Sequence, residues 1–217
     1  MTLDVLDSPE AVADAAARRF LDLAPRSVGL AGGSTPARLY RLLRHVDLGD
    51  VEWWFGDDRW VPADHEQSNE GMARRELLDP IGATRVHPMF RGESPAEDAA
   101  AYECELGDTV LDLLLVGLGD DGHTLSVFPG FDDWPTAPGR VAATRAPANW
   151  PDRITLLPSY ARTAREIHFL VTGEAKAEAL ERLLAPTGDE RVTPARALRG
   201  PNVRIFCDAD AAGRLTG

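Results

Sequence analysis

The stretch LDLLLVGLGDDGHT, residues 111–124, decides the fold. Its first half, Leu111 to Gly117, is a nearly continuous apolar run, which is typical of a strand in a sheet that is covered on both faces. Other short apolar runs alternate with helical stretches along the chain. Strands that alternate with helices predict an α/β fold, in which helices form layers on both sides of a mostly parallel central sheet.

Capping signals and apolar runs set the bounds of the predicted elements. Ser8 before Pro9 predicts a helix that continues to about Leu23, and a capping box at 94–97 begins a helix that ends near residue 106. Further helices are expected after the turn at 32–36 and near residues 174–184 and 208–214. The remaining strands of this sheet are expected at residues 27–31, 51–55, 153–157, 167–172 and 203–207. The stretch 131–152 is rich in proline and alanine and is expected to be irregular.

Length and charge limit the class of protein. A chain of 217 residues is expected to form one domain over residues 1–217. It carries 23 basic and 35 acidic residues, a formal charge of −12, and shows no cluster of lysine and arginine. Such a surface repels phosphate backbones, so we expect no nucleic-acid partner.

Cysteine usage and the chain's first residues predict a cytoplasmic protein. Cys104 and Cys207 are far apart in the sequence and have no metal-ligand spacing, which indicates buried thiols in a reducing compartment. Met1 to Glu10 has neither a basic run nor an apolar stretch, so no signal peptide is expected there. No apolar run is long enough to cross a bilayer, and we expect no membrane partner.

Four predicted strands are each followed by glycine and polar residues, at 32–35, 56–59, 117–124 and 172–176. In open α/β sheets, ligands bind beyond the carboxyl ends of the strands. The four segments therefore predict one binding site.

The turn at 32–36, Gly-Gly-Ser-Thr-Pro, has two interpretations. Gly33 lets the backbone approach a ligand, and Ser34 and Thr35 offer hydroxyls and amides at the start of a helix, where an anion is favoured. Serine and threonine are also common helix caps in turns that bind nothing. This segment alone does not decide between the two.

The loop at 117–122 matches the dinucleotide fingerprint G-x-G-x-x-G, but we reject that interpretation. Asp120 and Asp121 would face a pyrophosphate, Pro129 would cut the following helix short, and no strand with an acidic end follows at the required distance.

His123 in the same loop is the candidate general base. The neighbouring Asp121 could hold its imidazole in one tautomer. A histidine that caps a helix or packs under the loop is the simpler alternative, and we apply it to His45, His65, His87 and His168. The strand-end position favours a catalytic role for His123. No second histidine or cysteine accompanies it at ligand spacing, so no metal is expected.

Three positively charged side chains are candidates for binding an anion. Lys176 is the single lysine among 22 arginines and lies in the first turn of a predicted helix, where a positive charge opposes the helix dipole unless an anion faces it. Glu174 could instead serve as its counter-charge. Arg59 and Arg153 border predicted strands, where surface ion pairs are the ordinary alternative.

Taken together, these segments resemble the 6-phosphogluconolactonase family. The stretches that carry the resemblance, in the same order and spacing, are residues 31–36, 57–62 with 68–69, VGLGDDGHTLSVFPG at 116–130, 153–156 and 169–176. The long stretch at 116–130 is the most specific. Asp58 stands where the family usually has glutamate, and Leu125 where it usually has alanine.

The resemblance implies the layered fold of sugar-phosphate isomerases and deaminases and the hydrolysis of 6-phospho-D-glucono-1,5-lactone without a cofactor. His123 and Asp121 would then be catalytic, and the substrate and its phosphate would be bound by Gly33, Ser34, Thr35, Arg59, Arg153 and Lys176. A monomer or small homo-oligomer is expected.

Two alternatives remain to be compared. An amino-sugar phosphate deaminase would share the turn and the Asp-Gly-His loop, but related sequences carry a carboxylate after that histidine, where Val127, Phe128 and Pro129 stand here. A sugar-phosphate sensor without catalytic activity would need a DNA-binding helix pair or a basic surface, and residues 1–27 have room for one helix only.

Overall fold

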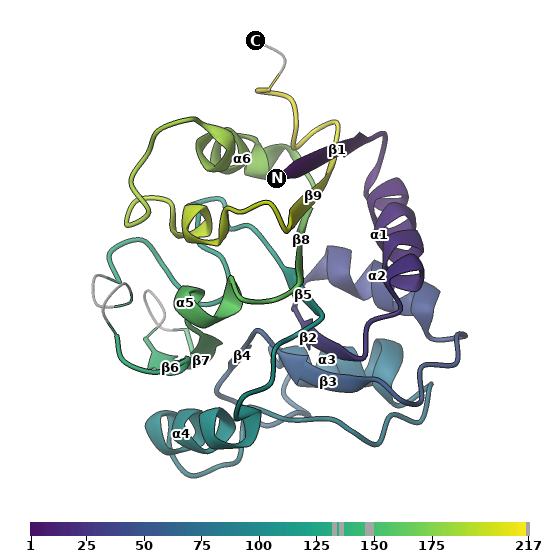
Figure 1. Cartoon of the computed structure of the whole chain (residues 1–217), viewed down its shortest axis with the longest axis vertical. Coiled ribbons are helices and arrows are strands. Elements are labelled where there is room, and N and C mark those ends of the chain that lie inside the picture. Colours follow the sequence, from purple (N-terminus) through teal and green to yellow (C-terminus); the bar gives the residue numbers. More distant parts are fainter. Residues whose placement is uncertain (132–133, 135–136, 146–149, 216–217) are drawn as a thin grey trace.

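The computed structural model describes residues 1–131, 134, 137–145 and 150–215. Six of the described strands form a central sheet in which all paired neighbours are parallel. Their order is β1 (Thr2–Leu6), β9 (Val203–Asp208), β8 (Glu166–Val171), β5 (Leu113–Val116), β2 (Ser27–Leu30) and β3 (Glu52–Phe55). Strand β5, formed by the apolar run of the sequence, therefore lies inside the sheet (Figure 1). This confirms the predicted α/β fold.

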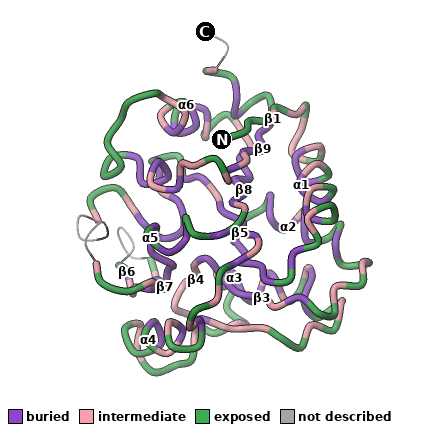
Figure 2. Tube along the Cα trace, viewed as in Figure 1, coloured by how far each residue is buried: buried purple, intermediate pink, exposed green. Residues whose placement is uncertain are grey.

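Helices cover both faces of this sheet (Figure 1). On one side lie α1 (Pro9–Leu23) and α2 (Ser34–Leu43). On the other lie α5 (Pro158–Ala161), α6 (Ala177–Leu184) and the 3-10 helix η3 (Pro194–Leu198). Of the short elements, α3 (Asn69–Ala73) and η1 (Arg74–Leu78, a π-helix) pack beside α2, and η2 (Glu174–Lys176) leads directly into α6. The central strands are buried (Figure 2). No helix in the described ranges has the length and apolarity to span a bilayer.

A second, antiparallel sheet lies beside the first. Its order is β4 (Asp57–Arg59), β7 (Arg153–Leu156) and β6 (Val141–Thr144), and α4 (Pro95–Leu106) packs against β6 and β7. The expectation that residues 153–157 join the central sheet is therefore wrong. The expectation of an irregular stretch at 131–152 is wrong for 141–144, which become a strand by pairing with β7; residues 132–133, 135–136 and 146–149 lie outside the described ranges.

Two further expectations differ from the structure, and one strand was missed. Residues 208–214 form turns rather than a helix: after one helix-type bond, from the amide of Ala212 to the carbonyl of Asp208, the next bonds span three residues, from Gly213 to Asp210 and from Leu215 to Ala212. Strand β1 was not predicted and pairs with β9 at the sheet edge. Cys104 is exposed on α4, and only Cys207 is buried as expected.

Two buried tyrosines join helices to strand ends. The Tyr40 hydroxyl on α2 donates to the carbonyl of Ala31 (2.8 Å) and accepts from its amide (3.0 Å), just beyond β2. The Tyr102 hydroxyl on α4 makes the same pair of bonds with Phe55, donating at 3.0 Å and accepting at 2.8 Å. Each tyrosine thereby satisfies backbone groups at a point where the strand leaves the sheet.

We expect Tyr40→Phe to lower the free energy of unfolding by about 1–3 kcal/mol, because it leaves the buried amide and carbonyl of Ala31 without partners. Urea unfolding measures this loss. Tyr160→Phe is the matched control, since that hydroxyl makes one bond, to the carbonyl of Thr109 at a partly buried position. An equal or smaller loss for Tyr40→Phe would contradict this account of the strand end.

Candidate active site

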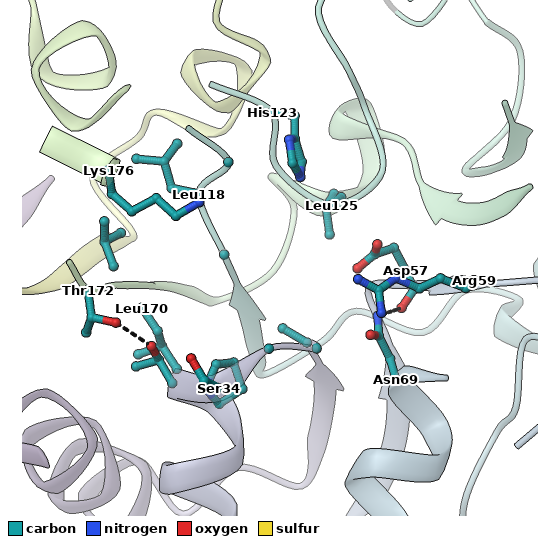
Figure 3. Close-up of a pocket in the computed structure, with 18 residues that line it drawn as sticks. Ser34, Asp57, Arg59, Asn69, Leu118, His123, Leu125, Leu170, Thr172 and Lys176 are labelled. Carbon is teal, nitrogen blue, oxygen red and sulfur yellow. Dashed lines mark hydrogen bonds between the residues drawn. The ribbon is translucent and has the colours of Figure 1, made fainter. Parts of the chain in front are cut away.

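A cavity of about 340 Å³ lies at the carboxyl ends of β2, β5 and β8 (Figure 3). All four strand-end segments singled out in the sequence contribute to its wall. The lining residues that carry polar side chains are Ser34, Thr35, Asp57, Arg59, Asn69, His123, Thr172 and Lys176. The apolar part of the wall includes Leu118, Leu125 and Leu170.

His123 reaches the cavity from the loop after β5. Its Nδ1 lies 2.6 Å from Oδ1 of Asp121, and its backbone amide donates to the same oxygen at 2.9 Å. The ring is about one-third exposed, 32% of its side chain, and lies 4.7 Å from the ring of Phe128. Because Asp121 accepts from Nδ1, the other nitrogen, Nε2, is left as the acceptor.

Burial and hydrogen bonding act in opposite directions on Asp121. Partial burial by itself would raise the pKa of this carboxyl, but the bonds that it accepts from the imidazole and amide of His123 outweigh burial and lower the pKa below its ordinary value. Asp121 is therefore ionised at neutral pH and can orient the ring.

The loop that carries His123 is held from two sides. Within the loop, the amide of Gly119 donates to the carbonyl of His123 at 2.8 Å. From behind, the amide of Ala195 in η3 donates to the carbonyl of Gly122 at 3.1 Å, and Arg182 of α6 donates to the carbonyl of Asp120 at 3.1 Å. Neither contact was expected from the sequence.

The turn at 33–35 begins α2 and faces the cavity. Gly33 adopts φ 106°, a conformation that favours glycine, and no side chain caps this helix. The amides of Ser34 and Thr35 consequently have no partner among the described groups. The Thr35 hydroxyl is buried and bonds that of Thr172 at 2.7 Å, so Thr35 offers the cavity its amide rather than its hydroxyl.

Lys176 reaches the cavity from a second turn, at the end of η2 and beyond Thr172 (Figure 3). It forms no ion pair with any carboxylate that the structure describes, and Glu174 does not act as its counter-charge. Asp208, 2% exposed at the end of β9, supports this turn by accepting from the amide of Gly173 at 3.0 Å. Nothing in the sequence distinguished Asp208.

Arg59 and Arg153 lie apart from Lys176. Figure 3 shows Arg59 across the cavity from Lys176, beside Asp57 and Asn69. Arg153 does not line this cavity but an adjoining hollow of about 250 Å³, which shares Asp57, Arg59, His123 and Leu125 with it. Arg59 and Lys176 thus line the same cavity, whereas Arg153 lines only the adjoining hollow.

Asp58 organises the side of the site that carries Arg59. It is buried and accepts from the amides of Arg59 (2.7 Å), Asn69 (2.7 Å) and Glu70 (2.9 Å), which joins β4 to the start of α3. Asn69 in turn donates to the carbonyl of Asp57 at 2.9 Å. Its side chain fills the space where a β-carbon on Gly32 would lie, so a residue with a side chain could not replace that glycine. Asn69 and Asp58 were noted in the sequence only as parts of a resemblance.

The chain matches the model of the family described as glucosamine-6-phosphate isomerases/6-phosphogluconolactonase over residues 7–207. It is 35% identical to the 6-phosphogluconolactonase of Synechocystis over 201 residues, 86% of this chain and 83% of that protein. The chain belongs to this family. The human 6-phosphogluconolactonase is 36% identical over 213 residues, which cover 88% of this chain and 81% of the human one.

A solved structure shows the same relationship in three dimensions. The 6-phosphogluconolactonase of Trypanosoma brucei superimposes with a TM-score of 0.88 at 30% identity, covering 99% of this chain and 98% of that one. Family membership accounts for the layered sheet and confirms the resemblance stated from the sequence. Within the described ranges, no group of three or more histidine, cysteine, aspartate or glutamate residues is placed to hold a metal ion.

The burial of Asp58 predicts a pH dependence of stability. Burial raises the pKa of this carboxyl from 3.8 to about 7, despite the opposing effect of three amide hydrogen bonds. The folded protein therefore holds a proton that the unfolded chain releases, and the contribution of Asp58 to stability is full below about pH 4 and declines as the pH rises towards 7.

We expect the wild type to lose stability relative to Asp58→Asn between about pH 4.5 and about pH 7.5, because asparagine does not titrate. Urea unfolding of both proteins over this range measures the difference. Asp64→Asn, at an exposed position between β4 and α3, is the control, and its stability should change with pH in parallel with that of the wild type. Parallel curves for Asp58→Asn as well would show that Asp58 is ionised throughout.

Proposed function

We propose that this chain hydrolyses 6-phospho-D-glucono-1,5-lactone to 6-phosphogluconate, a step of the oxidative pentose phosphate pathway, with His123 as the general base. The observation that carries the proposal is the 2.6 Å contact between His123 Nδ1 and Asp121 at the wall of a polar cavity, which leaves Nε2 to accept a proton. The curated relatives named above, which are 6-phosphogluconolactonases, support the substrate.

The reaction follows from the chemistry of a cyclic ester. A water molecule gives a proton to Nε2 of His123 while its oxygen forms a bond to the lactone carbonyl carbon. The carbonyl electrons move to oxygen, and a tetrahedral oxyanion results. When these electrons return, the bond from C1 to the ring oxygen breaks, and the imidazolium gives its proton to that oxygen. The acid that forms then ionises to a carboxylate and releases one proton.

Asp121 stabilises the charged intermediate of this cycle. Its lowered pKa keeps the carboxylate ionised while the neighbouring imidazole gains and loses a proton. The ion pair formed in the intermediate is absent when the ring is neutral, so it favours the transition state over the bound substrate. Two groups of amides are candidates for the oxyanion site, those of the turn 33–35 and those of the loop 119–122. The phosphate site proposed below occupies the turn. In the loop, the amides of Gly119, Asp121 and Gly122 donate to loop oxygens, so the amide of Asp120 remains for the oxyanion.

The phosphate of the substrate binds at the turn 33–35 and Lys176. The site for this dianion consists of the amides of Ser34 and Thr35 at the start of α2 and the ammonium of Lys176, which have no partners among the residues that the structure describes. Phosphate held there leaves the sugar ring to extend towards His123, with Arg59 on the far side. Arg59 and Arg153 therefore contact substrate groups other than the phosphate.

Three further expectations accompany this function. A single domain over residues 1–217, a cytoplasmic location and a monomer or small homo-oligomer each stay predictions.

We expect His123→Ala to reduce kcat for lactone hydrolysis by about 10²–10⁴-fold, since it removes the general base. The rate of lactone loss above spontaneous hydrolysis measures this effect. His45→Ala, at an exposed histidine outside the cavity, should keep the parent rate. Near-normal turnover by the His123 variant would refute the assigned role, and release of ammonia from glucosamine 6-phosphate would indicate a deaminase.

We expect Lys176→Met to raise KM for the phosphorylated lactone about tenfold or more, because a charge-assisted contact with the phosphate is lost. The same variant should leave KM for glucono-1,5-lactone, which has no phosphate, close to the parent value. Steady-state kinetics with the two substrates separates the outcomes. Equal changes with both lactones would place the phosphate elsewhere.

A further inference from the structure

A second hollow adjoins the cavity and shares His123 with it. It encloses about 250 Å³ and is lined by Arg153, Trp150, Phe128 and Ser126 together with the four residues shared with the first cavity and Asp121. The proposed binding of the phosphate at Lys176 does not use this space. Arg153 gives it a buried cation.

Arg153 is well buried, with 6% of the residue exposed, and its Nε donates to no group in the described parts of the chain. Its guanidinium lies 5.9 Å from the ring centroid of Trp150. Burial, together with repulsion from Arg59, outweighs the attraction of Asp57 and Asp58 and lowers the pKa of Arg153 to about 10, so it remains a cation at neutral pH. A buried cation with an unsatisfied donor is costly unless an anion completes it.

Arg59 adds a second cation at the same place. Strands β4 and β7 pair so that Arg59 lies directly opposite Arg153. Like charges at directly opposed positions of an antiparallel pair repel one another. Arg59 also has a buried Nε without a partner in the described ranges, although its Nη1 donates to the carbonyl of Gln67 at 2.6 Å.

The carboxylates near this pair are engaged with other groups. Asp57 accepts from the hydroxyl of Ser126 at 2.6 Å, and Asp121 accepts from His123. Asp58 faces the backbone amides described above. None of the three forms an ion pair with either arginine in the part of the chain that the structure describes. The two guanidinium groups can therefore bind a carboxylate from a ligand.

The proposed reaction produces such a group beside His123. Ring opening converts the neutral ester at C1 into a carboxylate, while the phosphate at the other end of the molecule is unchanged. Because His123 and Arg59 line both hollows, C1 lies next to the second hollow when the phosphate is at Lys176.

We propose that Arg153 and Arg59 form a carboxylate subsite, which binds the C1 carboxylate of the open-chain product and is separate from the phosphate subsite. This inference rests on the proposed function. The subsite predicts that the protein binds a sugar-acid phosphate more tightly than the sugar-alcohol phosphate that has a hydroxymethyl group in place of the carboxylate. Substrate and product then differ in their contacts with Arg153, and this contact contributes more to product affinity than to lactone affinity.

The test compares two ligands that differ only at C1, by calorimetric titration of the whole protein. 6-Phosphogluconate carries the carboxylate, and glucitol 6-phosphate carries a hydroxymethyl group in its place. The wild type should bind the acid about tenfold more tightly, which corresponds to about 1.4 kcal/mol. Arg153→Gln should remove most of this preference while retaining the affinity for inorganic phosphate, and Arg59→Gln should act in the same direction.

Arg140→Gln is the matched control. It removes a positive charge next to β6 of the same sheet, from a side chain that pairs with Asp108 at 3.3 Å and lines neither hollow. It should keep the full preference for the acid. If the wild type bound the two ligands with equal affinity, that result alone would overturn the inference, and no variant would be needed.

An unchanged preference in a folded Arg153→Gln protein would also overturn the subsite. Loss of inorganic phosphate binding in that variant would assign Arg153 to the phosphate instead. A lactone turnover assay on the wild type tests the proposed function separately, so that failure of the subsite and failure of the lactonase activity give different results.

Discussion

The imidazole of His123 can lie against its own loop only because residue 119 has no side chain. A β-carbon on Gly119 would overlap both Nδ1 of His123 and the carboxylate of Asp121. The 2.6 Å contact that sets the tautomer therefore depends on close approach of the ring to the backbone. Strand β5 fixes the start of this loop, while η3 and α6 fix its far side through the carbonyls of Gly122 and Asp120. The central sheet and the helices on one of its faces thus each fix one side of the short loop that carries His123.

Charge is distributed in a way that the net value of −12 conceals. Most surface arginines pair with nearby carboxylates, as Arg41 does with Glu76 at 2.7 Å. The three cations around the cavity and its neighbouring hollow have no such partners among the described residues. An acidic surface disfavours anions in general, so local unpaired cations are needed for a phosphorylated ligand to bind. Their separation onto two sides of His123 matches a ligand that is charged at one end before the reaction and at both ends after it.

The sequence was informative where a local signal determines the structure. The cap at Ser8, which accepts from the amide of Ala11 at 3.2 Å, and the apolar run of β5 are such signals, and both elements form where expected. Strands β4 and β6 have three and four residues and exist through their pairing with β7, which no local pattern encodes. For the same reason, the sequence led us to assign Arg153 and Lys176 to one anion site. Both residues lie in stretches that resemble the family, but only the position of β7 in the second sheet shows that Arg153 lines a different hollow. Asp208 was missed because its role depends on a contact with Gly173, 35 residues away.

Leu125 lies in the wall that the two hollows share, and hydrogen bonds of its neighbours fix its position. Its φ of 55° is left-handed, which costs a residue with a side chain about 1–2 kcal/mol. Both neighbours are fixed by hydrogen bonds: the Thr124 hydroxyl donates to the carbonyl of Gly117 at 2.8 Å, and the amide of Ser126 donates to the hydroxyl of Thr155 at 3.1 Å. With both sides held, the backbone at 125 cannot relax, and its buried side chain is directed into the wall shared by the two hollows. The Ser126 hydroxyl also donates to Asp57, which lines the same hollow as the two arginines. The short segment 124–126 therefore both directs Leu125 into the apolar wall and engages this carboxylate.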